Sequence, residues 1–178
     1  AFGARTISYS LYPNLSANGW GEPDARGQAV RELNRNLDFR KAVTYALDRQ
    51  ALGEALVKGP FTTPYAGGLM PPTSYYDNDS TVYYPYSLDD AKALLEKAGL
   101  VDTDGNGFVN FPADVVGGAD VEITLLATSD YQTDKSLAEG VIAQMERLGL
   151  RVIAQFQAAN QRDANYQAGK FDWQVLRN

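Results

Sequence analysis

Residues 121–156 constrain the fold of this chain more than any other stretch. Val121–Ala127 reads VEITLLA and Leu150–Phe156 reads LRVIAQF, two short runs typical of buried strands. The segment between them, Thr133–Leu148, is predicted to be a helix that ends at Gly149. Its inward side chains are Leu137, Val141, Met145 and Leu148. Strand, helix and strand with short links predict a βαβ unit, in which the strands are parallel and the crossover is right-handed.

Two further strands are predicted near the ends of the chain. Thr6–Tyr12 alternates apolar and smaller or polar residues, which is the period-two pattern of a strand, and Pro13 ends it. Phe171–Leu176 is the second, reached through a polar segment, 157–170, that has room for a short helix. Asn14–Gly27 is rich in Asn, Gly, Pro and Asp, and we expect a loop there.

Capped helices fill the first half of the chain. Asp38 precedes a helical run whose apolar residues recur at spacings of three and four, and Asp48 is placed to cap a second, short helix over Arg49–Val57. Ser87 is placed to cap a third helix, which the glycine at Gly99 ends. Together with the βαβ unit, these elements predict an α/β fold, a mixed sheet with helices packed on it.

Residues 61–86 have no sustained period and are rich in proline and tyrosine. Proline limits chain entropy and tyrosine supplies buried area, so we expect an ordered crossing loop within one domain that spans residues 1–178. The tyrosines could stack on a ligand or cover the domain's own core. The sequence leaves both open.

Composition excludes several kinds of function. The chain has no histidine and no cysteine, which removes His-based acid–base catalysis, Ser-His-Asp and Cys-His nucleophiles, and Cys/His zinc sites. We therefore expect no enzyme activity and no cofactor. The net charge of -6 argues against a nucleic-acid partner.

The sequence DTDGNG begins like a calcium-binding loop. Asp102, Asp104 and Asn106 stand at ligand positions, with glycine at the sixth position. The twelfth position, which needs a bidentate carboxylate, is Ala113. A tight turn whose side chains bond to their own backbone is the favoured interpretation, and we predict no metal site.

The loop after the first strand of the βαβ unit is the best candidate for ligand contact. Ligands of open α/β sheets collect at the carboxyl ends of strands, where loop side chains and helix amides converge. We expect substrate-binding residues in this loop and on or beyond the last strand, with ordinary surface as the alternative for each. The candidates are Ser129, Tyr131, Trp173, Arg177 and Asn178.

An ordered series of short motifs resembles family 5 of the extracellular solute-binding proteins of bacterial ABC importers. The helix and cap around Asp48 match a phrase like FRxAxxyAiDR, and residues 84–99 match a phrase like y.pYdxxkAkxLLxxAG. A proline- and tyrosine-rich crossing, a DxDGxG turn, a helix ending near qLxxiG and a strand that opens with FD follow in the family's order. The matching residues are Phe39, Arg40, Ala42, Tyr45, Ala46, Asp48, Arg49, Pro71, Pro72, Tyr75, Tyr76, Asp77, Tyr84, Pro85, Tyr86, Ala91, Lys92, Leu94, Leu95, Ala98, Gly99, Met145, Leu148, Gly149, Leu150, Phe171 and Asp172.

The resemblance implies one lobe, the carboxyl-side one, of a two-lobed type II periplasmic binding fold. Such proteins close two lobes on a solute outside the cytoplasmic membrane and deliver it to permease subunits. It implies a periplasmic, or extracellular and membrane-anchored, location. The implied partners are a small solute (peptide, opine, oligosaccharide or metal chelate), the permease and a missing amino-side lobe. The alternative is a secreted calcium-stabilised domain of a larger hydrolase.

Overall fold

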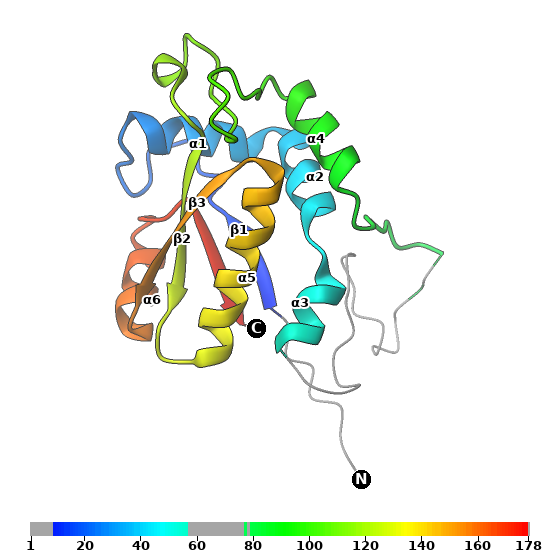
Figure 1. Ribbon diagram of the computed structural model, residues 1–178. Coiled ribbons are helices and arrows are strands. Elements are labelled where there is room, and N and C mark those ends of the chain that lie inside the picture. The colour runs from blue at the N-terminus through cyan, green and yellow to red at the C-terminus, as the bar shows by residue number, and fades with distance from the viewer. Residues whose placement is uncertain (1–8, 57–76, 78, 178) are drawn as a thin grey trace.

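A mixed sheet of four strands lies at the centre of the structure, with the strand order β1-β4-β2-β3 (Figure 1). The strands are β1 (Tyr9–Pro13), β2 (Glu122–Thr128), β3 (Arg151–Gln157) and β4 (Trp173–Arg177). β2 pairs in parallel with both β3 and β4, whereas β1 is antiparallel to β4. The carboxyl ends of the three parallel strands therefore lie at one edge of the sheet, which we call the carboxyl edge.

The helices are α1 (Ala25–Arg35), α2 (Leu37–Ala46), α3 (Arg49–Leu56), α4 (Leu88–Lys97), α5 (Gln132–Leu148) and α6 (Ala159–Gln167), with a short 3-10 helix, η1, at Val116–Gly118. In the part of the chain that the structure describes, no helix is both long enough and apolar enough to cross a membrane.

This computed structural model describes residues 9–56, 77 and 79–177, without the side chain of Arg177. Residues 6–8 of the first predicted strand, most of the predicted crossing loop 61–86, and Asn178 lie outside the described residues. Of that loop, residues 79–86 are described, and they form no helix or strand.

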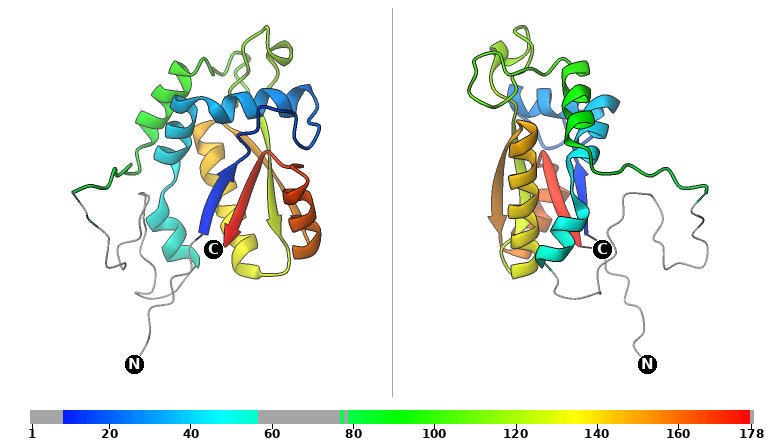
Figure 2. Two further views of the ribbon diagram at one scale, coloured as in Figure 1. Left: turned by 180° about the vertical axis from the view of Figure 1, so that it is seen from behind. Right: turned by 45° about the vertical axis from the view of Figure 1, so that its right-hand side comes forward.

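Helices cover the sheet on both faces (Figure 2). α5 follows β2 and packs on β2, β3 and β4, whereas α6 leads back from β3 to β4 and contacts β2 and β3. Since β3 and β4 flank β2 on opposite sides, right-handed crossovers place α5 and α6 on opposite faces. The main core lies on the α5 face, where α1, α2 and α4 complete it. Its largest fully buried apolar side chains include Trp173, Phe39, Leu95, Leu100, Ile123, Leu125 and Met145.

The structure confirms the βαβ unit and two of the caps that the sequence predicts. β2 and β3 run parallel in continuous register on either side of α5. The N–H of Ala51 donates to Asp48 Oδ1 at 2.9 Å, which caps α3, and the N–H of Asp90 donates to Ser87 Oγ at 3.3 Å, which caps α4. Together with the sheet, these elements confirm a mixed α/β fold with helices packed on it.

The sequence did not predict α1. The loop expected over 14–27 ends early, at Asp24, which caps α1 by accepting from the N–H of Gly27, and Asn36 then caps α2. α1 is hard to recognise because its buried face includes two polar residues, Arg31 and Asn34, which interrupt the apolar stripe.

A buried polar network ties α1 to the two neighbouring strands β1 and β4. The side-chain amide of Asn34 donates to the carbonyl oxygens of Asn14 and Asp172, at 3.1 and 3.3 Å. Its Oδ1 accepts from Trp173 Nε1 at 2.8 Å. Asn34 and Trp173 are 0% and 1% exposed, so water cannot replace these bonds.

We predict that Asn34→Ala lowers the free energy of unfolding by about 2–3 kcal/mol, because it leaves the buried Trp173 indole N–H without its acceptor and removes a donor from the carbonyl groups of Asn14 and Asp172. Urea unfolding followed by tryptophan fluorescence measures the change. The matched control is Asn160→Ala, at an exposed position of α6, which we expect to stay within about 0.5 kcal/mol of the parent. Equal effects of the two substitutions would contradict the assigned role of the network.

Candidate functional site

The loop between β2 and α5 lies at the carboxyl edge, as the sequence predicts. The backbone N–H of Ser129 donates to the carbonyl oxygen of Gln157 at 2.8 Å, which ties the loop to the end of β3. Thr128 is fully buried, and its Oγ1 accepts from the N–H of Asp130 at 3.2 Å. Two residues at strand ends thus hold the loop, while Ser129 itself is exposed.

Tyr131 is 49% exposed and occupies the N-cap position of α5. Its backbone is extended and its side chain makes no capping hydrogen bond. About half of the residue's surface is therefore open to solvent at the start of α5, on the edge that the strand ends form. Ser129 and Tyr131, which the sequence singled out together, lie two residues apart in this loop.

The other three predicted site residues belong to β4 or follow it. Trp173 is 1% exposed, and its ring packs against Phe39 with 6.2 Å between ring centroids. Its side chain is part of the core and is closed to a solute. Arg177 pairs with Tyr9 at the end of β4, on the carboxyl edge, and its side chain is not described. Asn178 lies outside the described residues.

Two carboxylates that the site prediction did not include also lie at this edge. Asp130 Oδ2 accepts from the N–H of Ala159, the first residue of α6, at 2.8 Å. Asp134 lies in the first turn of α5 and is 4% exposed. The cap of Asp130 joins positions 29 residues apart, so no local pattern in the sequence indicates it.

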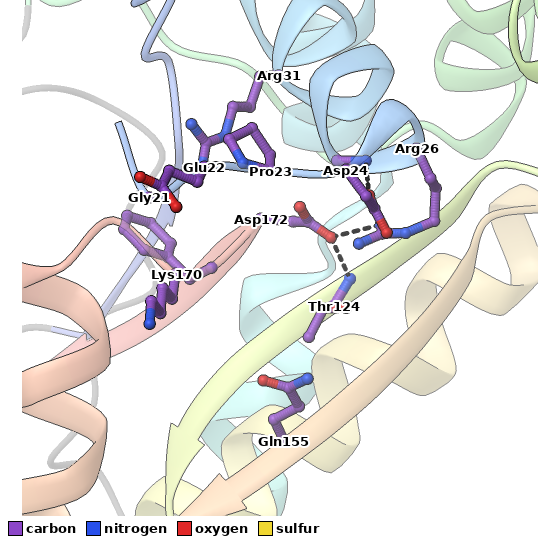
Figure 3. Close-up of a pocket in the computed structure, with 12 residues that line it drawn as sticks. Gly21, Glu22, Pro23, Asp24, Arg26, Arg31, Thr124, Gln155, Lys170 and Asp172 are labelled. Carbon is purple, nitrogen blue, oxygen red and sulfur yellow. Dashed lines mark hydrogen bonds and ion pairs between the residues drawn. The ribbon is translucent and has the colours of Figure 1, made fainter. Parts of the chain in front are cut away.

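A separate pocket of about 360 Å³ opens beside α1 and the turn that precedes β4 (Figure 3). At its base, Arg26 forms an ion pair with Asp172 at 2.7 Å, and the same carboxylate oxygen accepts from the N–H of Thr124 at 2.9 Å. Burial lowers the pKa of Arg26, but the hydrogen bond and charge of Asp172 outweigh it, so that the pKa is raised overall. Asp24, also in the lining, caps α1. The ion pair at the base therefore joins α1 to the sheet, whereas Asp24 fixes the start of α1 itself.

The DTDGNG segment forms a turn stabilised by its own backbone. The carboxylate of Asp102 accepts from the N–H groups of Gly105 and Gly107, at 2.7 and 2.9 Å, and the bond from Gly107 is the main cause of its lowered pKa. Asn106 accepts from the N–H of Phe108 with Oδ1 and points its NH₂ group at Asp104. An asparagine that binds calcium presents its oxygen, so this arrangement is that of a turn.

The turn is also attached to β3. Asn106 Nδ2 donates to both carboxylate oxygens of Asp120, and Asp120 pairs with Arg151 at 2.8 Å. The Arg151 guanidinium lies 4.2 Å from the centroid of the Phe108 ring. Among the described residues, no group of three or more His, Cys, Asp and Glu side chains is placed to hold a metal ion.

Comparison with known proteins gives one family. The family model described as bacterial extracellular solute-binding proteins, family 5 middle, matches residues 2–178. A periplasmic alpha-galactoside-binding protein of Rhizobium meliloti (strain 1021) is 65% identical over 178 residues, which is 100% of this chain and 26% of that protein. A heme-binding protein A of Haemophilus influenzae is 29% identical over 163 residues, 83% of this chain and 27% of that protein.

Solved structures give the same fold. The periplasmic binding protein MelB of Agrobacterium fabrum C58, in complex with stachyose, superposes with a TM-score of 0.96 at 61% identity, over 100% of this chain and 27% of that one. An oligopeptide-binding protein OppA, at 21% identity, superposes with a TM-score of 0.77 over 95% of this chain and 24% of that one. The chain thus spans about a quarter of the length of the relatives that it matches.

We predict that calcium does not stabilise the chain, because the Asp102 carboxylate and the Asn106 oxygen already accept backbone N–H groups. The melting temperature in about 10 mM calcium should lie within about 1 °C of the value in chelator, although that concentration exceeds the dissociation constants of extracellular calcium modules. A rise of several degrees would restore the calcium-stabilised alternative. Asp102→Ala should lower the melting temperature equally with and without calcium.

Proposed function

Because this chain belongs to the bacterial extracellular solute-binding proteins of family 5, we propose that it forms one lobe of a periplasmic protein that captures an oligosaccharide of the α-galactoside class. The lobe would contribute one wall of the solute cleft, and the complete protein would deliver the solute to the permease of an ABC importer.

The likeness to two binding proteins of known solute class carries this proposal. The alpha-galactoside-binding relative is 65% identical over the whole chain, and the binding protein solved with stachyose is 61% identical with a TM-score of 0.96. The peptide-binding structure reaches only 21% identity, which supports a shared fold and says nothing of the solute. Among the solute classes that the sequence leaves open, oligosaccharide therefore has the strongest support.

The carboxyl edge supplies groups suited to a sugar. We propose that the exposed ring of Tyr131 packs on a pyranose face and that Ser129 exchanges hydrogen bonds with sugar hydroxyls. Arg177 and Asn178 remain predicted contacts, on the grounds of their place at or after the end of β4. Trp173 acts through the core, as part of the packing that fixes β4.

The proposed mechanism is closure of two lobes around the solute. A solute that contacts both walls stabilises the closed state because it binds that state more tightly than the open one. The second wall would come from sequence beyond this chain, which spans 26% of its alpha-galactoside-binding relative. Permease subunits would then recognise the closed pair of lobes, and the protein itself would perform no catalysis.

A chimera tests the proposal. This chain should replace the matching quarter of the Rhizobium meliloti protein without loss of folding, since the two segments are 65% identical. We expect the chimera to bind stachyose by calorimetry with an affinity within about tenfold of the parent, a difference of about 1.4 kcal/mol. The isolated chain, with one wall only, should bind far more weakly. A folded chimera with no α-galactoside binding would refute the proposed solute class.

Within the chimera, we predict that Tyr131→Ala weakens stachyose binding about tenfold, because an aromatic platform of this kind contributes about 1 kcal/mol or somewhat more. Tyr86→Ala is the matched control, since Tyr86 is 45% exposed against 49% for Tyr131 and lies just before α4. Unchanged affinity in the Tyr131 variant, measured by the same calorimetry, would remove Tyr131 from the proposed site.

A further inference from the structure

Two helices begin side by side at the carboxyl edge. α5 starts at Gln132 and α6 at Ala159, and the bond from the Ser129 N–H to the Gln157 carbonyl joins the segments that precede them. The amino end of a helix carries unpaired N–H groups and the positive end of the helix dipole, so it attracts anions. An edge with two such helix ends would favour an anionic solute, unless the protein itself supplies the negative charge.

Asp130 supplies that charge to α6. Its Oδ2 accepts from the N–H of Ala159 at 2.8 Å, and Ala158, in the N-cap position, has no side chain able to do so. Asp130 is itself exposed, so its carboxylate stands between solvent and the first turn of α6. An incoming anion would meet a like charge where it would otherwise meet a free N–H group.

Asp134 brings a second carboxylate to the start of α5. The residue is 4% exposed, and its Oδ1 has no hydrogen-bond partner. The oxygen is enclosed by the protein, so Asp134 acts on a solute at this edge through its charge and not by direct contact. An anionic group near the start of α5 would be repelled by it.

The described cations nearest in sequence have partners of their own. Lys135 lies over the Phe156 ring, 5.6 Å from its centroid, with Glu139 at 4.0 Å. Arg162 pairs with Asp163 at 2.7 Å. None of the ion pairs among the described residues includes Asp130 or Asp134. The negative charges of these two carboxylates are therefore not neutralised by a described cation.

We propose that Asp130 is a specificity-determining residue, which makes the carboxyl edge select uncharged polyhydroxyl solutes and reject anionic ones. It does so by accepting the N–H group at the start of α6 that an anion would otherwise use, while Asp134 adds a second negative charge in the first turn of α5. The inference rests on the proposed function for the claim that this edge faces the solute. It adds a reason why an uncharged sugar, and not an acidic solute, fits there.

Amide NMR on the ¹⁵N-labelled chain tests the inference with galactose and galacturonate, which share a ring and differ by a carboxylate. In the parent chain, we expect galacturonate to cause no saturable shift of the Ala159 and Asn160 amides. In Asp130→Ala, which frees the Ala159 N–H and removes the charge, galacturonate should cause a saturable shift, with an affinity at least about fivefold above the upper limit that the parent titration sets. Asp130→Asn keeps an oxygen for the cap and loses the charge, so a smaller saturable shift is expected.

Asp89→Ala is the matched control, because Asp89 is an exposed carboxylate in the first turn of α4, and its loss changes the net charge equally. It should leave the Ala159 amide insensitive to galacturonate. Saturable galacturonate binding at Ala159 in the parent overturns the inference. So does its absence in both Asp130 variants, or in Asp130→Asn alone if the alanine variant does not fold. Stachyose binding by the chimera is a separate measurement, so a wrong solute class and a wrong role for Asp130 give different results.

Discussion

The arrangement of the sheet depends on the hydrogen bonds and the ion pair of one buried residue, Asp172. Its carboxylate accepts from Arg26 in α1 and from the N–H of Thr124 in β2, and its carbonyl oxygen accepts from the Asn14 N–H and the Asn34 amide. One residue at the start of β4 thus fixes a helix and two neighbouring strands. A carboxylate that is 5% exposed needs such partners, because a buried charge without them is strongly destabilising.

The sequence predicts those parts of the fold in which local pattern and packing agree. α5 has a regular apolar stripe, and Gly149 ends it in the left-handed conformation, with φ of 91°. α1 escapes prediction because its packing depends on Arg31 and Asn34, whose partners include Gly169 and Asp172, each more than 130 residues away. A polar residue buried by distant carbonyl groups looks, in sequence, like a residue on the surface.

The candidate site is predictable to a similar extent. Chain topology alone indicates the carboxyl edge, and with it Ser129 and Tyr131. Trp173 could not be assigned to a face in the same way, since a strand buried on both sides gives no sign of which side holds the core. Asp130 belongs to the predicted loop, but its role depends on where α6 begins, 29 residues later. The role of Asp130 therefore depends on a contact between residues distant in the sequence, which local sequence patterns do not reveal.

The pairing of β1 with β4 also bears on the order in which the chain folds. The first described strand pairs with the last, Tyr9 with Arg177, whereas β2, α5 and β3 are consecutive and can associate early. Because contacts between distant segments form slowly, β1 must remain without its partner until β4 has been synthesised. Until then the unpaired backbone groups of β1 are open to association with another strand, which makes β1 the part of the sheet most exposed to mispairing during folding.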